Sequence, residues 1–203
     1  MTAALRCARA AMAAAIVVAT VAQYDHSSDR PTFSAANFFS YFTVISNVLL
    51  VVVLVGLVAR PLLRDADGFG AIRGTATLGI VATGLVYAVL LAPASADVDV
   101  TLRWVDLVLH TVAPIFGLVD WLVDPPRRRP TTAAAASWLL LSFVWLPYTM
   151  VRGPIVDWYP YPFLDPDEES VASIVVTSLG IAVVFVLIAA ALRWWSGRRA
   201  AIA

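Results

Sequence analysis

The sequence has no lysine and only one cysteine, Cys7, among its 203 residues. A single cysteine excludes an internal disulfide bond, and the chain has neither a Cys-x-x-Cys motif nor a Cys/His cluster for a structural metal ion. Charged residues are scarce, at 14% compared with about 25% in soluble domains, and the formal net charge is zero. Such a chain lacks the basic surface of a nucleic-acid-binding protein. We therefore expect no metal ion, no cofactor and no nucleic-acid partner.

Hydrophobic residues make up 61% of the chain and gather in six long apolar runs. The runs cover residues 4–24, 37–59, 75–96, 104–124, 132–151 and 171–192, separated by segments rich in Pro, Gly, Asp or Arg. Each run is close to the length of about 20 residues that a membrane-spanning helix needs. The first run also resembles a cleaved signal peptide, but it is longer than the apolar part of a typical one. The pattern predicts an all-α polytopic membrane protein, a six-helix bundle that forms a single transmembrane domain over residues 1–203.

The arginines are divided unevenly between the two sides of this predicted bundle. Because basic residues are retained on the cytoplasmic side, the division predicts that both the N- and C-termini are cytoplasmic. Eleven arginines then lie inside, namely Arg6, Arg9, Arg60, Arg64, Arg73, Arg127, Arg128, Arg129, Arg193, Arg198 and Arg199, and three outside, namely Arg30, Arg103 and Arg152. The exclusive use of arginine and the alanine-rich runs indicate a GC-rich bacterial genome. We therefore expect a multipass protein of the bacterial cytoplasmic membrane.

The fourth run contains polar residues, which are costly inside a membrane. Asp106 and His110 are four residues apart and share a helix face, so the carboxylate can hold the imidazole in one tautomer. Asp120 lies near the cytoplasmic end of the same run. One interpretation is a set of buried polar contacts that holds helices together. Another is a proton or solute path lined by Asp106, His110 and Asp120.

The second run carries a polar stripe on an otherwise apolar helix. Asn37, Ser40, Thr43 and Asn47 recur at spacings of three, three and four residues, and Ser46 lies beside them. Small polar residues in membrane helices often serve only to join one helix to another. Three of these residues carry hydroxyl groups, however, and are candidate nucleophiles.

Depth in the membrane brings one of these hydroxyls to the level of the histidine. In the predicted topology the second and fourth helices both run inward from the outer surface. Thr43 lies six residues past Asn37, and His110 lies six past Trp104, which is about 9 Å at 1.5 Å per residue. A hydroxyl beside an imidazole can attack an ester or amide, because the base removes the hydroxyl proton. The apolar surroundings suit a lipid substrate.

Other residues can support such a reaction or compete for a part in it. Asn47, one turn below the threonine, can donate a hydrogen bond to a developing oxyanion, as can Tyr148 or Trp145 of the fifth run. Ser40 and Ser46 are rival nucleophiles. The outer segment 152–170 is rich in aromatic residues and proline, so it can lie at the headgroup level or fold into the bundle as a lid.

Four stretches of the chain carry a resemblance to a known family. They are NFFSYFTVISN at 37–47, LHTVAP at 109–114, Trp145, and YPYPFLD at 159–165. Together they resemble the androgen-induced membrane protein family, especially its bacterial branch, and the resemblance extends from the second helix through the sixth. It implies a multipass hydrolase that cleaves fatty acid esters of hydroxy fatty acids with a threonine nucleophile and a histidine. In this sequence the matching residues are Thr43, within Tyr-Phe-Thr, and His110, within His-Thr-Val-Ala-Pro.

The sequence thus leads to one principal hypothesis and two alternatives. The principal hypothesis is an intramembrane hydrolase of lipid or fatty acyl esters, in which Thr43 attacks, His110 removes its proton and Asp106 orients His110. The first alternative is a small transporter or proton relay that uses Asp106, His110 and Asp120. The second is a non-enzymatic membrane scaffold.

Overall fold

The computed structural model describes residues 2–92 and 102–200, and its regular secondary structure within these ranges is helical, without strands. The α-helices are α1 (Ala3–Ser28), α2 (Ala35–Phe38), α3 (Phe42–Ala59), α4 (Asp67–Val86), α5 (Arg103–Leu107), α6 (Ala113–Val123), α7 (Thr132–Ser137), α8 (Leu140–Val156) and α9 (Val171–Ala200). Two π-helical turns, η2 (Tyr87–Leu91) and η4 (Val108–Val112), continue α4 and join α5 to α6. Two 3₁₀ turns are η1 (Pro61–Asp65) and η5 (Pro162–Leu164).

Six segments of the described chain are long and apolar enough to cross a membrane. They are Ala3–Ser28, Phe42–Ala59, Gly68–Leu91, Arg103–Val123, Thr132–Val156 and Val171–Arg198. The predicted all-α, six-helix polytopic membrane protein is therefore confirmed. The fifth span continues past the predicted end at 151 to Val156, and its α8 portion contains Pro147 and Pro154. The end predicted for the third span, at 96, lies outside the described residues.

The second span differs from its prediction in a way that affects the site. A continuous helix from residue 37 was expected, but α2 ends at Phe38 and α3 begins only at Phe42. The predicted polar stripe is therefore interrupted, because Asn37 precedes the break, Ser40 lies within it and Thr43 follows it. Asn37 instead accepts a hydrogen bond from Arg152 of α8, at 2.6 Å.

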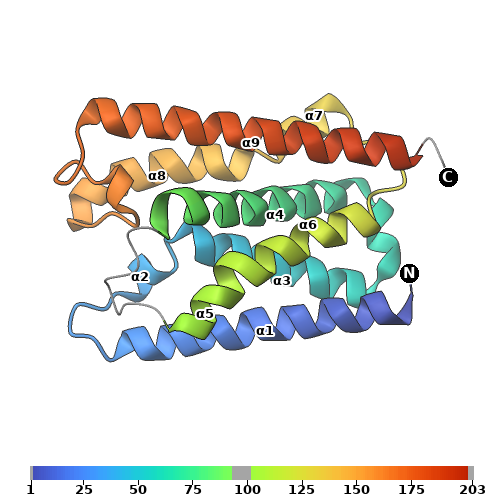
Figure 1. Cartoon of the computed structure of the whole chain (residues 1–203), viewed down its shortest axis with the longest axis horizontal. Helices are drawn as coiled ribbons and strands as arrows, with labels where there is room; N and C mark the ends of the chain where they lie inside the picture. Colours follow the sequence, from blue (N-terminus) through green and yellow to red (C-terminus); the bar gives the residue numbers. More distant parts are fainter. Residues whose placement is uncertain (1, 93–101, 201–203) are drawn as a thin grey trace.

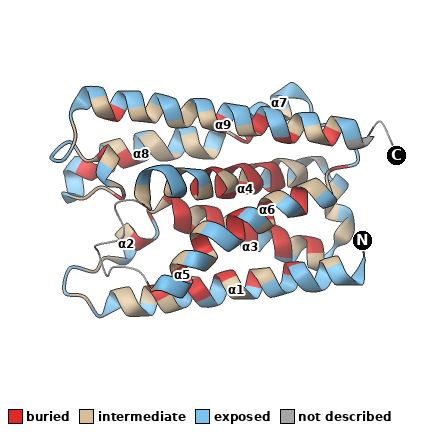
Figure 2. Cartoon of the chain, in the orientation of Figure 1, coloured by how far each residue is buried: buried red, intermediate tan, exposed pale blue. Residues whose placement is uncertain are grey.

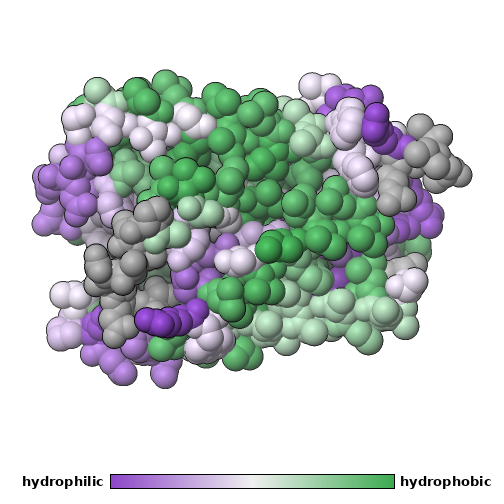
Figure 3. Space-filling model, in the orientation of Figure 1, coloured by the Kyte–Doolittle hydropathy of each residue, from purple (hydrophilic) through white to green (hydrophobic). Residues whose placement is uncertain are grey.

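The helices run along the long axis of the molecule, and both termini lie at the same end (Figure 1). Helices α3 and α4 occupy the middle, with α1 along one side and α9 along the opposite side (Figure 1). Buried residues concentrate in α3 and α4, whereas few residues of α8 and α9 are buried (Figure 2). On the face drawn in Figure 3, hydrophobic residues form a broad band over the middle, and hydrophilic residues gather toward the two ends. This distribution matches a bundle surrounded by lipid along its length.

Candidate active site

Thr43 lies in the first turn of α3. The helix begins here because Tyr41 has an extended backbone, with φ −62° and ψ 129°, which breaks the path from α2. The side chain of Tyr41, the N-cap residue, does not hydrogen-bond to the start of the helix. The N–H groups of the first turn have no acceptor within the helix, so the N–H of Thr43 is available to an outside partner. Thr43 itself is buried, with 7% of its surface exposed.

His110 lies in the middle of η4 and is held by two groups. Its Nδ1 is 2.8 Å from Oδ1 of Asp106, and the hydroxyl of Tyr87 donates to Oδ2 of the same carboxylate at 2.5 Å. The ring of Tyr87 also stacks on the imidazole, with 4.1 Å between centroids and 9° between planes. An ionised carboxylate can only accept hydrogen bonds, so Asp106 fixes Nδ1 as the protonated nitrogen. In the neutral imidazole, Nε2 of His110 is then an acceptor.

Nε2 of His110, the ring nitrogen that does not bond to Asp106, faces the hydroxyl of Thr43. Nε2 lies 3.3 Å from Oγ1, although 67 positions separate the two residues in the chain. Carboxylate, imidazole and hydroxyl therefore stand in the order of a catalytic triad. The structure brings together the two residues for which the sequence predicted a common level, and their catalytic roles stay a prediction.

Gly84 allows α4 to approach closely the turn η4 and the start of α6. A Cβ at position 84 would lie 2.6 Å from Cβ of Pro114 and 3.3 Å from the carbonyl oxygen of His110. Only a residue without a side chain fits there, since both contacts are shorter than ordinary packing distances. Tyr87 follows Gly84 by less than one helical turn, so this approach also sets the stack of Tyr87 on His110.

The segment after α8 folds back into the bundle and reaches Thr43. Helix α8 ends at Val156, the C-cap residue Asp157 has a left-handed backbone (φ 51°), and Leu164 of η5 is 1% exposed. Of the two arrangements predicted for residues 152–170, the structure has the one that enters the bundle. The hydroxyl of Tyr161 accepts a hydrogen bond from the N–H of Thr43 at 3.2 Å and lies 3.3 Å from its Oγ1. Burial raises the pKa of Tyr161 to about 12.

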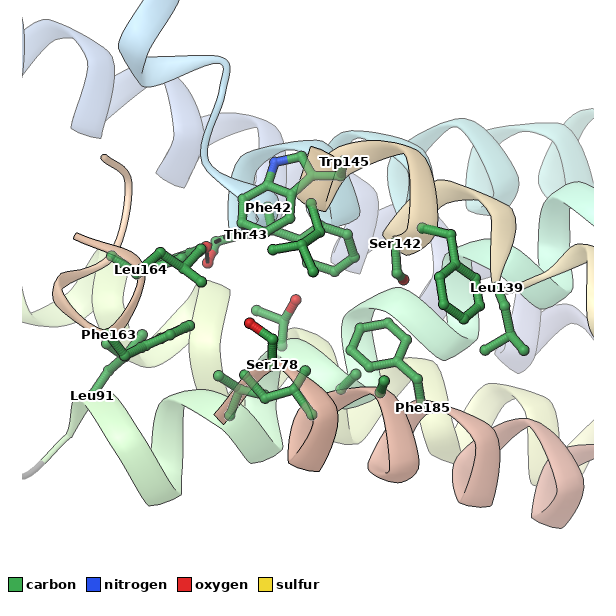
Figure 4. A pocket seen from close by; sticks show the side chains of 18 residues that line it. Phe42, Thr43, Leu91, Leu139, Ser142, Trp145, Phe163, Leu164, Ser178 and Phe185 are labelled. Carbon is green, nitrogen blue, oxygen red and sulfur yellow. Dashed lines mark hydrogen bonds between the residues drawn. The ribbon is translucent and has the colours of Figure 1, made fainter. Parts of the chain in front are cut away.

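An apolar cavity adjoins the hydroxyl of Thr43 (Figure 4). It holds about 780 Å³ of space free of protein atoms, a volume that includes its opening to the outside, and most of its lining side chains are apolar, as in many ligand pockets. Its walls come from α4, α8, α9 and the segment around η5. Thr43 and Leu164 lie at one end of the cavity, and Leu139 lies at the other (Figure 4). A long apolar group can therefore extend from Thr43 between α8 and α9.

Asn47 lies close to the site, but both hydrogens of its amide group are already used. Its Nδ2 donates to the carbonyl oxygen of Thr43 at 2.9 Å and to that of Leu109 at 3.3 Å. These bonds join α3 to η4 one turn below the hydroxyl. The geometry therefore supports a positioning role for Asn47 and not the oxyanion contact expected from the sequence.

Trp145 and Tyr148 likewise bond away from the hydroxyl of Thr43. Nε1 of Trp145 donates to the carbonyl oxygen of Ser40 at 2.9 Å, and the hydroxyl of Tyr148 lies 2.9 Å from Oγ of Ser40. The other rival nucleophile, Ser46, accepts a hydrogen bond from Thr83 at 3.3 Å. Within residues 2–92 and 102–200, neither serine has a histidine as a hydrogen-bond partner.

Asp120 belongs to a separate polar cluster toward the end that carries the termini. Its Oδ1 lies 2.6 Å from Nε of Arg9, and its Oδ2 lies 3.0 Å from Nη2 of Arg73. Both arginines are fully buried, so this cluster ties α1, α4 and α6 together. Arg73 was expected in a connecting segment but lies inside α4. Asp120 follows His110 by ten residues, about 15 Å along a helix, and the structure does not join the two.

Asp124 extends this cluster toward the surface. It pairs with Arg9 at 2.9 Å and with Arg64. Burial alone would raise the pKa of Asp124, but hydrogen bonds and charge from the two arginines hold it below its ordinary value. These contacts have the character of a structural network.

The sequence reasoning missed two residues of the site. Tyr87 lies in the third span, where a single tyrosine among apolar residues does not indicate a polar helix face. Its partner Asp106 is 19 positions away. Tyr161 lies in the aromatic-rich segment that the sequence had singled out, but its contact with Thr43 spans 118 positions. Neither pairing follows from spacing within one helix.

The fold and this site define a class: a six-span membrane protein with a threonine–histidine–aspartate chain of hydrogen bonds beside an apolar cavity. No family model, curated protein or solved structure matches the chain. Among the described residues, no group of three or more His, Cys, Asp or Glu side chains could hold a metal ion. The function is therefore inferred from the chemistry of the site and from the resemblance carried by its sequence motifs.

Proposed function

We propose that this protein is an intramembrane hydrolase of lipid esters, with Thr43 as nucleophile, His110 as general base and Asp106 as the residue that orients His110. The observation that carries the proposal is the contact of 3.3 Å between Oγ1 of Thr43 and Nε2 of His110, next to an apolar cavity. A threonine hydroxyl is a weak nucleophile until a base removes its proton. Nε2 is an acceptor only while Nδ1 carries the proton, and the bond from Nδ1 to Asp106 keeps it there.

The reaction has two stages with one proton carrier. Oγ1 of Thr43 bonds to the acyl carbon while its proton passes to Nε2 of His110, which then protonates the leaving alcohol. Water next attacks the acyl-threonine, again giving a proton to Nε2. That proton returns to Oγ1 as the carboxylic acid leaves, so the net change is ester plus water to acid plus alcohol. The side chains of His110 and Asp106 are 15% and 30% exposed, so the protein does not seal the base completely.

The apolar cavity supports a binding site for the acyl chain of the substrate. Its apolar walls suit a fatty acyl group whose carbonyl carbon is at Thr43. The sequence resemblance extends this to fatty acid esters of hydroxy fatty acids. The arginine bias supports cytoplasmic termini in a bacterial cytoplasmic membrane, and the site then faces the outer leaflet.

The test uses the purified full chain in lipid nanodiscs and a fluorogenic ester of a medium-chain fatty acid. Thr43→Ala and His110→Ala should each reduce hydrolysis to background while the thermal unfolding curve is retained. Ser40→Ala is the matched control, because it removes a nearby hydroxyl that has no histidine partner among the described residues. Unchanged turnover in both Thr43→Ala and His110→Ala would refute the proposal.

Two further measurements distinguish the hydrolase from a membrane scaffold and from a proton relay. A fluorophosphonate probe should label the wild type and the Ser40→Ala variant but not Thr43→Ala, whereas a scaffold would not be labelled. A proton relay through Asp120 would instead give pH-dependent uptake into proteoliposomes that Asp120→Asn abolishes. The buried pairing of Asp120 with Arg9 and Arg73 supports the hydrolase over this relay.

A further inference from the structure

The hydroxyl of Tyr161 contacts both polar atoms of Thr43 that matter for ester attack. It lies 3.2 Å from the backbone nitrogen and 3.3 Å from Oγ1. The ring is fixed by Phe163, stacked at 5.3 Å and 6°, and by the edges of Tyr41 at 5.8 Å and Trp145 at 5.9 Å. Packing of this kind holds a functional group in one place more firmly than a free loop would.

The direction of each hydrogen bond follows from the chain of contacts. Asp106 accepts from Nδ1 of His110, so Nε2 accepts from the hydroxyl of Thr43. The oxygen of Thr43 then offers only lone pairs to other groups. Because the oxygen of Tyr161 already accepts the N–H of Thr43, its own hydrogen points to Oγ1. Tyr161 is therefore a donor aimed at the oxygen that attacks.

Attack changes what this donor can bond to. When Oγ1 bonds to the acyl carbon it becomes an ester oxygen, which is a poorer acceptor, and the former carbonyl oxygen on the same carbon gains the negative charge. We propose that Tyr161, whose oxygen accepts the N–H of Thr43 in the first turn of α3, is a catalytic residue that donates its O–H to this oxyanion. This inference rests on the proposed function. The N–H groups at a helix start favour negative charge for the same reason that they bind anions.

Other nearby donors are committed to different acceptors. Asn47 donates to the carbonyl oxygens of Thr43 and Leu109, and Trp145 donates to that of Ser40. Among the described residues, Tyr161 is therefore the side-chain donor bonded to Oγ1 of Thr43, since Nε2 of His110 accepts from that hydroxyl. Its pKa, raised to about 12 by burial, keeps the O–H protonated at neutral pH.

The first test compares Tyr161→Phe with the wild type on the same fluorogenic ester in nanodiscs. The substitution keeps the packed ring and removes only the donor, so we expect kcat to fall about 10²- to 10³-fold with little change in KM. Tyr159→Phe is the matched control. It is a tyrosine of the same segment whose ring packs on Gly153, and kcat should stay at the wild-type value.

The outcomes separate this inference from the proposed function. If Thr43→Ala abolishes hydrolysis while Tyr161→Phe keeps the wild-type kcat, Tyr161 only packs against the site and the inference fails alone. If Tyr161→Phe is faster than the wild type, the hydroxyl obstructs the site, and the inference again fails. If Thr43→Ala has no effect, the proposed function fails first.

A second readout does not depend on how well the phenylalanine variant folds. Replacing Tyr161 with difluorotyrosine keeps the donor but lowers the pKa of the phenol. Activity should survive at neutral pH, and its alkaline decline should shift to lower pH than in the wild type. An unchanged alkaline limb would overturn the inference, because a purely packing role does not depend on the acidity of the phenol.

Discussion

The rings of Tyr87 and His110 lie face to face, 4.1 Å apart, and each residue also bonds to a different oxygen of Asp106. Tyr87 belongs to η2 and His110 to η4, so two π-helical turns from different spans hold one carboxylate. Such turns interrupt the regular helix and occur often at functional sites. The stack fixes the plane of the imidazole, and the shared carboxylate fixes its tautomer.

We expect Tyr87→Phe to lower kcat/KM for the fluorogenic ester by about 10- to 100-fold, because one hydrogen bond to a charged group contributes about 1.5–3 kcal/mol. Tyr87→Leu removes the stacked ring as well and should be slower still. The measurement is steady-state kinetics on variants whose folding has been checked by thermal unfolding. Equal rates for Tyr87→Phe and the wild type would show that Asp106 needs no second donor.

Gly84→Ala should reduce both stability and turnover. Its new methyl group would overlap Pro114, and overpacking of this kind costs about 1–3 kcal/mol. The control is Gly180→Ala on α9, where nothing lies within 4 Å of the added Cβ. That variant should be neutral or more stable, by up to about 1 kcal/mol, since alanine favours a helix. Equal unfolding curves for the two variants would contradict the close approach of α4 to the turn that carries His110.

Asp120→Asn should mainly destabilise the fold. Loss of the carboxylate leaves Arg9 and Arg73 buried without their shared partner, and breaking a buried pair costs about 3–5 kcal/mol. Hydrolysis per folded molecule should stay near the wild-type rate, since Asp120 does not contact the site. Asp65→Asn is the control, because Asp65 is partly exposed and its ion pairs are 3.5 Å long. A stable Asp120→Asn variant with no activity would point to the relay.

Ala182→Phe should shift the substrate preference of the enzyme from long-chain to short-chain esters. Ala182 lines the cavity, so a phenylalanine there should slow hydrolysis of long-chain esters by about tenfold or more while sparing an acetyl ester, as expected when a pocket is filled. Val183→Phe, at an exposed position of α9 that does not line the cavity, is the control and should leave both rates unchanged. The ratio of kcat/KM for the two esters is the measurement. An unchanged ratio in Ala182→Phe would show that the acyl chain lies elsewhere.

Tyr161 should make stability depend on alkaline pH. Its pKa is raised from about 10 in the unfolded chain to about 12 in the folded protein. Below about pH 10 both states hold the proton and the contribution is complete, and it is lost as pH rises from about 10 to 12 because only the unfolded state releases the proton. The Tm measured across this pH range should fall more steeply for the wild type than for Tyr161→Phe. Parallel curves would contradict the burial of this hydroxyl.

The local pattern of the sequence was sufficient for the membrane class and for part of the site. Long apolar runs cannot be kept from water in any other compact form, so six spans could be predicted from composition and length alone. The pairing of Asp106 with His110 also followed from helical spacing, because residues four apart share a face. The helix break before Phe42 did not follow, since Phe39 to Tyr41 include neither the proline nor the glycine that commonly marks such a break.

Within this protein, the sequence by itself determined the number of spans, the scarcity of charge in them and the presence of a histidine beside a carboxylate. Only the tertiary structure decided that Thr43 faces His110, that Tyr161 returns to contact Thr43, and that Asp120 is sealed between two arginines. The physical reason is that hydropathy acts on each helix separately. The rotation and approach of helices depend on contacts between distant residues, such as a missing side chain at Gly84 against Pro114.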